Sequence, residues 1–127
     1  MLRRALFPVT ALAAVATMAA SCLSPTLPLP PPDAPQSVTQ TSGGVWVVTG
    51  ECIPGAIVSV LNTKTGVGLI VQDLENTGNF AVEISGSPCD AISVWQEDGD
   101  ELSSAVAFQL QAYAEGEPTS VSTCGGN

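Results

Sequence analysis

The sequence predicts an all-β fold, a single antiparallel β-sandwich of six to seven strands that follows a signal peptide and a proline-rich linker. Two observations lead to this prediction. Beyond residue 36, short runs rich in valine and isoleucine recur, separated by Gly, Asn, Asp or Pro, the residues that make turns. Within these runs apolar and polar residues alternate, as expected of strands with one buried face. No run beyond residue 21 shows the period of about 3.6 residues that marks a helix.

The N-terminal segment has the organisation of an export signal. Residues 1–4 are basic, and residues 5–20 are apolar apart from one proline and two threonines. This apolar stretch is shorter than the ~20 residues that cross a bilayer, and it is typical of a signal peptide core. Three small residues, 19–21, then stand directly before Cys22.

This order resembles the lipobox of bacterial lipoproteins, with Ala19 at the position where most lipoboxes have leucine. In that family the cysteine thiol is acylated and the chain is cut just before it. The resemblance implies that residues 1–21 are a lipoprotein signal peptide and that Cys22 is the lipidation site. It also implies an exported chain, lipid-anchored to the outer membrane or cell surface and facing the periplasm or the exterior. The alternative is an ordinary cleavage site followed by a structural cysteine.

Residues 22–36 are expected to be the lipidated cysteine and a proline-rich spacer. Six of the thirteen residues 23–35 are proline, which excludes a helix or a central strand because proline lacks an N–H and has a fixed φ. An extended polyproline II conformation is expected instead. Thirteen residues at ~3.1 Å each would span about 40 Å, so we interpret the segment as a stiff spacer between membrane and domain.

The globular part is expected to span residues 37–112, with residues 113–127 as a C-terminal tail. The expected strands are 37–41, 45–49, 56–61, 68–72, 79–84, 91–96 and 104–111. Alternation along these strands assigns most of their larger apolar residues to an inner face. The expected core is Val48, Val58, Val60, Leu69, Val71, Phe80, Val82, Ile84, Ile92, Val94, Val106 and Phe108.

The order of the turns resembles the bacterial Ig-like domains of surface and adhesion proteins. The resemblance covers about residues 45–110, through Val48-Thr49-Gly50, Pro54-Gly55-Ala56 before alternating valines, and Gly78-Asn79-Phe80 before another strand. It implies an Ig-like sandwich with a binding or structural role. These motifs are turn patterns, so they specify a fold and no chemistry.

Composition and charge narrow the function further. The chain has 3 Lys plus Arg, 12 Asp plus Glu and no histidine. Lys64 is the single side-chain cation beyond the N-terminal segment, which leaves one cation against twelve carboxylates, or −11. Such a surface repels nucleic acid, so no nucleic-acid partner is expected. Without histidine or a Gly-x-Ser-x-Gly motif, the sequence does not favour an enzyme.

The cysteines beyond Cys22 predict one disulfide. An exported chain can form disulfides, and three cysteines leave one thiol over. If strands alternate in direction, Cys52 lies at one end of the sandwich, and Cys89 and Cys124 lie at the other. The Cα separation limit of about 7 Å then favours Cys89–Cys124. The alternative is Cys52–Cys89, if loop geometry overrides this simple alternation.

Two groups of residues are candidate sites. Clustered carboxylates around Gly99 could bind Ca²⁺ through oxygen ligands, or could form a solvated acidic hairpin that protects a sheet edge. These residues are Glu97, Asp98, Asp100 and Glu101. Trp95, Ile57 and Leu61 alternate out of phase with their buried neighbours and are expected to share the outer face of one sheet. Such an apolar patch is typical of a partner site, or it is covered by the linker or the tail.

The function predicted from these features is a non-catalytic, lipid-anchored binding or structural module of the cell surface or periplasm, with no resident cofactor. Its partners are expected to be the membrane, through the lipid, and another envelope protein or a surface polymer. Two alternatives remain open. One is an accessory subunit of an envelope or secretion assembly, bound through the Trp95 face. The other is a Ca²⁺-binding adhesion domain.

Overall fold

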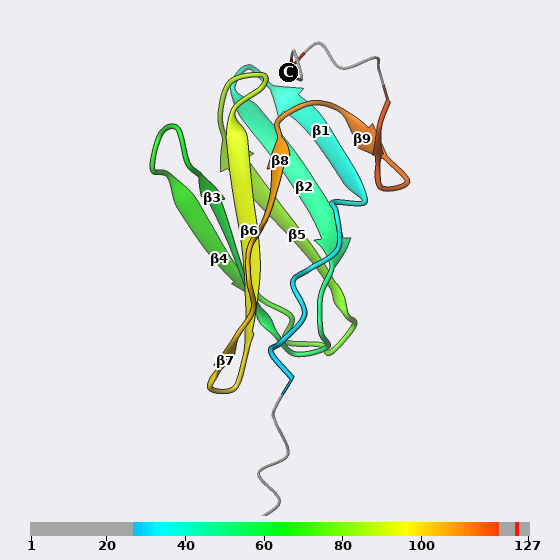
Figure 1. Cartoon of the computed structure of the whole chain (residues 1–127). Helices are drawn as coiled ribbons and strands as arrows, with labels where there is room; N and C mark the ends of the chain where they lie inside the picture. Colours follow the sequence, from blue (N-terminus) through cyan, green and yellow to red (C-terminus); the bar gives the residue numbers. More distant parts are fainter. Residues whose placement is uncertain (1–26, 120–123, 125–127) are drawn as a thin grey trace, which may run out of the picture.

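The chain folds into two antiparallel sheets packed face to face (Figure 1). The computed structural model describes residues 27–119 and 124, and the regular structure of this part consists entirely of strands. The sequence-based prediction of an all-β sandwich is therefore confirmed. All seven expected strands occur, and three strands of two residues each bring the total in the described part to ten.

The first sheet, sheet A, has the strand order β10-β9-β1-β2-β5. Its strands are β1 (Ser37–Ser42), β2 (Val45–Glu51), β5 (Asn79–Ser85), β9 (Tyr113–Ala114) and β10 (Glu117–Pro118). Strand β9 pairs with β1 at Val38, and the Tyr113 ring packs edge-on against Phe108 at 5.9 Å between centroids. Sheet A thus continues beyond residue 112 into the segment expected to be a tail.

The second sheet, sheet B, has the order β4-β3-β6-β7, and β8 also pairs with β6. Its strands are β3 (Ile57–Asn62), β4 (Gly68–Gln72), β6 (Ala91–Asp98), β7 (Glu101–Leu102) and β8 (Val106–Gln109). Strands β3 and β4 form a hairpin that ends the sheet, so β4 is its edge strand. Figure 1 shows this hairpin on the side of the molecule away from β9.

The core lies between the two sheets and contains most of the residues assigned to it from alternation. On strand β5, for example, exposed and buried residues alternate without exception, as alternation in the sequence predicts. The prediction was wrong for Leu69, which is 42% exposed, while Val71 and Val106 are partly buried. Leu69 lies on the edge strand, where sheet A does not fully cover sheet B. The core cluster also includes three residues outside the expected list, Val38, Trp46 and Leu110.

The spacer packs against the domain over part of its length. Leu29, Pro32 and Pro35 are buried, and this spacing of three residues matches the repeat of polyproline II. The buried Gln96 side chain holds the segment, since its Nε2 donates to the Pro30 carbonyl at 2.8 Å and its Oε1 accepts from the Ile53 N–H at 2.8 Å. The stretch 29–35 therefore lies along the sandwich. The prediction that the whole proline-rich segment is a spacer extending away from the domain was wrong for this stretch.

At the end of the sandwich where the linker enters, Asp73 fixes the β4–β5 turn. Its carboxylate accepts hydrogen bonds from the N–H groups of Gly55 (3.2 Å), Thr77 (3.0 Å) and Gly78 (2.7 Å). It also accepts one from the Thr77 hydroxyl at 3.0 Å. Gly78 has a φ of 75°, a backbone conformation that favours glycine, which explains the Gly-Asn-Phe turn of the sequence.

These hydrogen bonds predict that folding is acid-sensitive. Burial of Asp73 opposes its ionisation, but the hydrogen bonds from Gly78, Thr77 and Gly55 outweigh this effect and lower its pKa below the ordinary 3.8. A lowered pKa in the folded state stabilises the fold above pH 3.8, and this contribution is lost as the pH falls through the folded-state pKa. Urea unfolding between pH 7 and 3 should show this loss. The variant Asp73→Asn should be less stable at pH 7 and should lose less on acidification; an unchanged pH slope would contradict the prediction.

The opposite end of the sandwich is held by a buried polar network and a disulfide. Asn62 Nδ2 donates to Asp90 Oδ2 at 2.9 Å and to the Ser85 carbonyl at 3.3 Å. The disulfide joins Cys89 to Cys124 with a Cα–Cα distance of 5.2 Å, which confirms the predicted pairing. The alternative pairing of Cys52 with Cys89 is wrong. Cys52 follows β2 at the linker end, about 20 Å of strand away from the β5–β6 loop that carries Cys89.

Candidate functional site

The outer face of sheet B is the candidate site, and the strand register defines it. Opposite residues on neighbouring strands point to the same side of a sheet. Ser59 on β3 is paired with Ile70 on β4 and with Trp95 on β6. The row Ile70–Ser59–Trp95 therefore crosses three strands on the outer face.

Two further rows flank this one. On one side Leu61 is paired with Gly68 and Ser93, and on the other Ile57 is paired with Gln72 and Glu97. The three residues predicted from alternation, Trp95, Ile57 and Leu61, thus share one face, as expected. Each is partly buried. Glu97 is the one charged residue of these three rows, so the surface they form is apolar or weakly polar.

Ser59 shows how closely this face is packed. It points outward with Ile57 and Leu61, yet it is only 5% exposed because its cross-strand neighbours are the large side chains of Ile70 and Trp95. Ser59, Leu61, Gly66, Ile70 and Trp95 line a shallow hollow of about 260 Å³. The outer face of sheet B therefore contains a hollow beside Ser59, between the side chains of Ile70 and Trp95.

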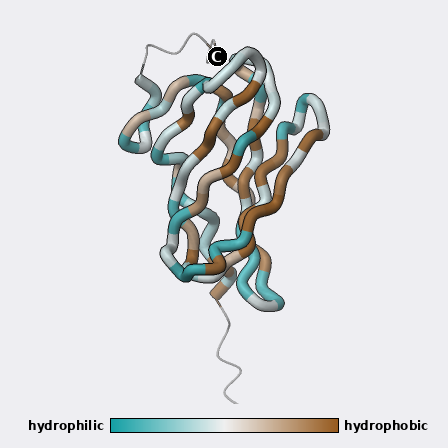
Figure 2. Tube along the Cα trace, turned by 180° about the vertical axis from the view of Figure 1, so that it is seen from behind, coloured by the Kyte–Doolittle hydropathy of each residue, from teal (hydrophilic) through white to brown (hydrophobic). Residues whose placement is uncertain are grey.

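Ile70 belongs to this face and was not predicted. It is 74% exposed, more than any other large hydrophobic residue of the three rows. The run Gly68–Gln72 contains three consecutive apolar residues. Alternation assigned Leu69 and Val71 to the inner face and did not mark Ile70 as part of an outer patch. Figure 2 shows the hydrophobic stretch of the β3–β4 hairpin at the margin of the molecule, with hydrophilic residues near its turn.

The acidic hairpin lies at the linker end of the molecule, where Figure 1 places β7. Asp98 on β6 is paired with Glu101 on β7, Glu97 is paired with Leu102, and Gly99 and Asp100 form the turn. Within residues 27–119 and 124, no group of three or more acidic, cysteine or histidine residues is arranged to hold a metal ion. The structure does not bring the four carboxylates together as a ligand set, and Ca²⁺ binding by them stays a prediction.

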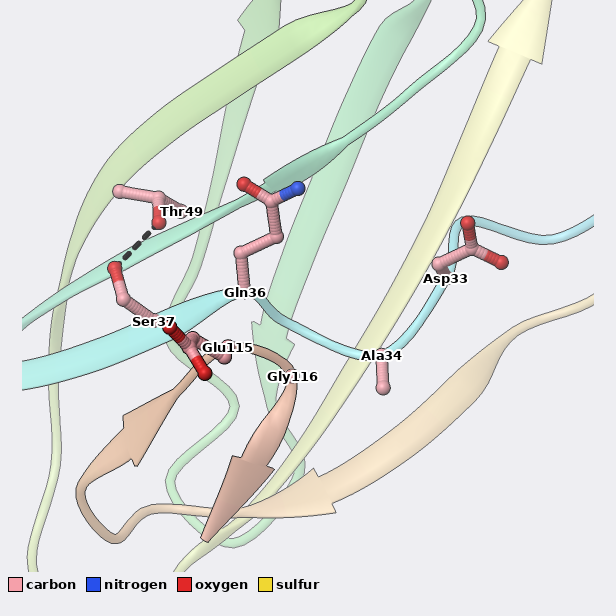
Figure 3. Close-up of a pocket in the computed structure, with 7 residues that line it drawn as sticks. All are labelled: Asp33, Ala34, Gln36, Ser37, Thr49, Glu115 and Gly116. Atoms are coloured by element: carbon pink, nitrogen blue, oxygen red, sulfur yellow. Dashed lines mark hydrogen bonds between the residues drawn. The ribbon is translucent and has the colours of Figure 1, made fainter. Parts of the chain in front are cut away.

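Another hollow, with a volume of about 760 Å³, lies elsewhere on the described surface. It is open and lies between the linker, the start of β1 and the β9–β10 turn (Figure 3). Asp33 and Glu115 reach it from two different segments, while Ser37 and Thr49 share a hydrogen bond on one wall. The two hydroxyls thus bond to one another. Among the seven lining residues, no hydrogen bond joins a possible nucleophile to a possible general base.

Cys52 is the free thiol of the described residues. Burial raises the pKa of this thiol, and the negative charge of Asp73 raises it further. A raised pKa keeps the thiol protonated at neutral pH, and a thiol is a poor nucleophile compared with a thiolate. This environment favours a packing role for Cys52 beside the core.

Cys22, the predicted lipidation site, lies outside the described residues. Among the residues that the structure does describe, no helix has the length and apolar character needed to cross a membrane. Comparison of the chain with models of protein families, with curated proteins and with solved structures found no match to any of them.

Proposed function

We propose that this chain is a non-catalytic, lipid-anchored module of the bacterial cell envelope that binds another envelope protein through the outer face of sheet B. The observation that carries the proposal is the row Ile70–Ser59–Trp95 with its apolar neighbours Ile57 and Leu61. An outward-facing tryptophan suits a protein partner, because tryptophan is enriched among the few residues that supply most of the binding energy of protein interfaces. The anchor part rests on the order of basic, apolar and small residues before Cys22.

The packed linker adds an orientation to this proposal. With the stretch 29–35 held against the domain, residues 23–28 are left to separate Cys22 from it, and six extended residues span about 19 Å. The end facing the membrane is then the one that carries the acidic hairpin and the Asp73 turn. Anionic headgroups repel these carboxylates, which keeps the outer face of sheet B clear of the bilayer.

Two experiments test the proposal. Metabolic labelling with a fatty acid should mark the wild-type chain and leave Cys22→Ser unlabelled; equal labelling would remove the anchor. Tagged wild type, Trp95→Ala and the control Val47→Ala, which changes a partly buried residue on the outer face of sheet A, are then purified from solubilised envelopes. At least one protein should be recovered with the wild type and the control and be lost with Trp95→Ala. Equal recovery of every protein with all three would remove the binding face.

A further inference from the structure

The edge strand β4 offers an unpaired backbone next to the Trp95 face. The Asn62 N–H donates to the Val67 carbonyl at 2.8 Å, and the Asp73 N–H donates to the Ala56 carbonyl at 3.0 Å, so these residues bond across the β3–β4 pair. Hydrogen-bonded residues alternate along an antiparallel pair. Leu69 and Val71 therefore bond to β3, while the N–H and C=O groups of Gly68 and Ile70 point outward from the sheet. No strand lies beyond β4 in sheet B.

Exposed aliphatic side chains concentrate on this same segment. Of the six large hydrophobic residues exposed in the described part, four lie between residues 67 and 74: Val67, Leu69, Ile70 and Leu74. Their exposures are 47%, 42%, 74% and 78%. A single exposed leucine is ordinary, but an aliphatic run along a free sheet edge is not.

The edge also lacks the usual protection. Edge strands commonly carry a charge, a proline or a bulge that prevents another strand from pairing. β4 has none of these in Gly68–Gln72, and its register with β3 runs without interruption. By contrast, β5 at the edge of sheet A carries Glu83, and β10 at the other edge consists of Glu117 and Pro118.

We propose that β4 accepts an extended, basic and aliphatic segment of a partner protein, which adds to sheet B as a further strand. The proposal rests on the binding function above and names the chemistry of the partner. Outward N–H and C=O groups spaced along a strand are matched by another extended backbone, and alternate aliphatic side chains would cover Leu69 and Ile70. The segment is basic because the described residues carry twelve carboxylates and a single cation, Lys64.

The same charge argues against a second copy of this chain as the occupant. Pairing of two β4 strands would bring together two domains, each with a net side-chain charge of −11. Glu75, in the turn after β4, would meet positive charge on a basic segment. Lys64, in the turn before β4, is already paired with Asp90 at 3.5 Å.

The test uses the full chain in a neutral detergent and a blocked seven-residue peptide of alternating lysine and valine. Amide NMR should show saturable shifts at Gly68, Ile70 and Gln72, and these should weaken at higher salt. Ile70→Lys should weaken binding at least about tenfold, because it adds a like charge at the edge and removes an aliphatic contact. Leu102→Lys is the matched control, since it makes the same change at a 59% exposed leucine on β7 and should bind as wild type.

Several outcomes would overturn the proposal. Equal binding of a peptide with glutamate in place of lysine would remove the charge argument. Equal binding of the lysine peptide after N-methylation of its valine amides would reduce the interaction to charge alone. Shifts confined to the acidic hairpin, or a β4-linked dimer in sedimentation that excludes the peptide, would place the partner elsewhere. If the peptide fails while Trp95→Ala still loses an envelope protein, this inference falls and the proposed function stands.

Discussion

Replacing Cys124 with serine is expected to lower the free energy of unfolding by about 3 kcal/mol, measured by urea denaturation of the oxidised chain. The disulfide joins residues separated by 35 positions, and the segment that it closes contains the five strands β6 to β10. A link of this length restricts the unfolded chain strongly. It also ties the tail to the β5–β6 loop, where Cys89 has a φ of 72° and its N–H donates to the Leu110 carbonyl at 2.7 Å.

Cys52→Ser is the control for this variant, because it makes the same substitution at the thiol that forms no disulfide. It should change stability by less than about 1 kcal/mol, since Cys52 is only partly buried at the margin of the core. It also prevents disulfide exchange during unfolding. If reduction of Cys52→Ser leaves its urea midpoint unchanged, the disulfide does not stabilise the fold and the prediction is contradicted.

The disulfide also shows how far local pattern determined the fold. Strand alternation places Cys52 at one end of the sandwich and Cys89 at the other, and that reasoning needed only the positions of the strands. The same patterns predicted every strand longer than two residues and placed Trp95, Ile57 and Leu61 on one face. Short-range periodicity is thus sufficient where each strand has one dry and one wet side.

Features that depend on which strands become edges could not be predicted in this way. The run Gly68–Gln72 is apolar on both faces, so its sequence indicates a buried strand, and only the sheet order shows that it is an edge with Leu69 and Ile70 exposed. The packed linker is a different case. Leu29, Pro32 and Pro35 are spaced three residues apart in the sequence. This spacing alone does not show that they are buried, because the segment must first be known to pack against the domain, where Gln96 binds it.

Asn62→Ala is expected to destabilise the chain by about 3 kcal/mol. Asn62 is fully buried, and its side chain connects two turns. Its Oδ1 accepts hydrogen bonds from the N–H groups of Lys64 (3.0 Å) and Thr65 (3.2 Å), which shape the β3–β4 hairpin. Its Nδ2 donates to Asp90 Oδ2 and to the Ser85 carbonyl in the β5–β6 connection. Alanine removes all four hydrogen bonds, and at the buried Asp90 Oδ2 it leaves the Ser87 N–H at 2.9 Å as the remaining hydrogen-bond donor. The loss of a donor to a buried carboxylate costs more than an ordinary hydrogen bond contributes.

Asp90 makes this loss severe. Its side chain is buried, and its Oδ1 has Lys64 Nζ at 3.5 Å as an ion-pair partner but no hydrogen bond. The hydrogen bond from Asn62 is the main cause of its lowered pKa, followed by the Ser87 N–H, so removal of Asn62 takes away the strongest support of the charged form. Asn62→Asp should also destabilise the fold at neutral pH, because it sets a second carboxylate against Asp90.

Asn79→Ala is the matched control, since Asn79 is exposed and its Nδ2 donates to the Thr77 carbonyl in a solvent-accessible turn. It should cost less than about 0.5 kcal/mol. If Asn62→Ala unfolds at the same urea concentration as Asn79→Ala, water replaces the hydrogen bonds of Asn62. The Asn62 side chain then does not stabilise the contact between the β3–β4 hairpin and the β5–β6 connection. If it is destabilised as expected, the hairpin that carries β4 is held in place from the disulfide end of the sandwich. In that case Asn62→Ala should also increase amide hydrogen exchange in β4, the strand proposed to bind the partner.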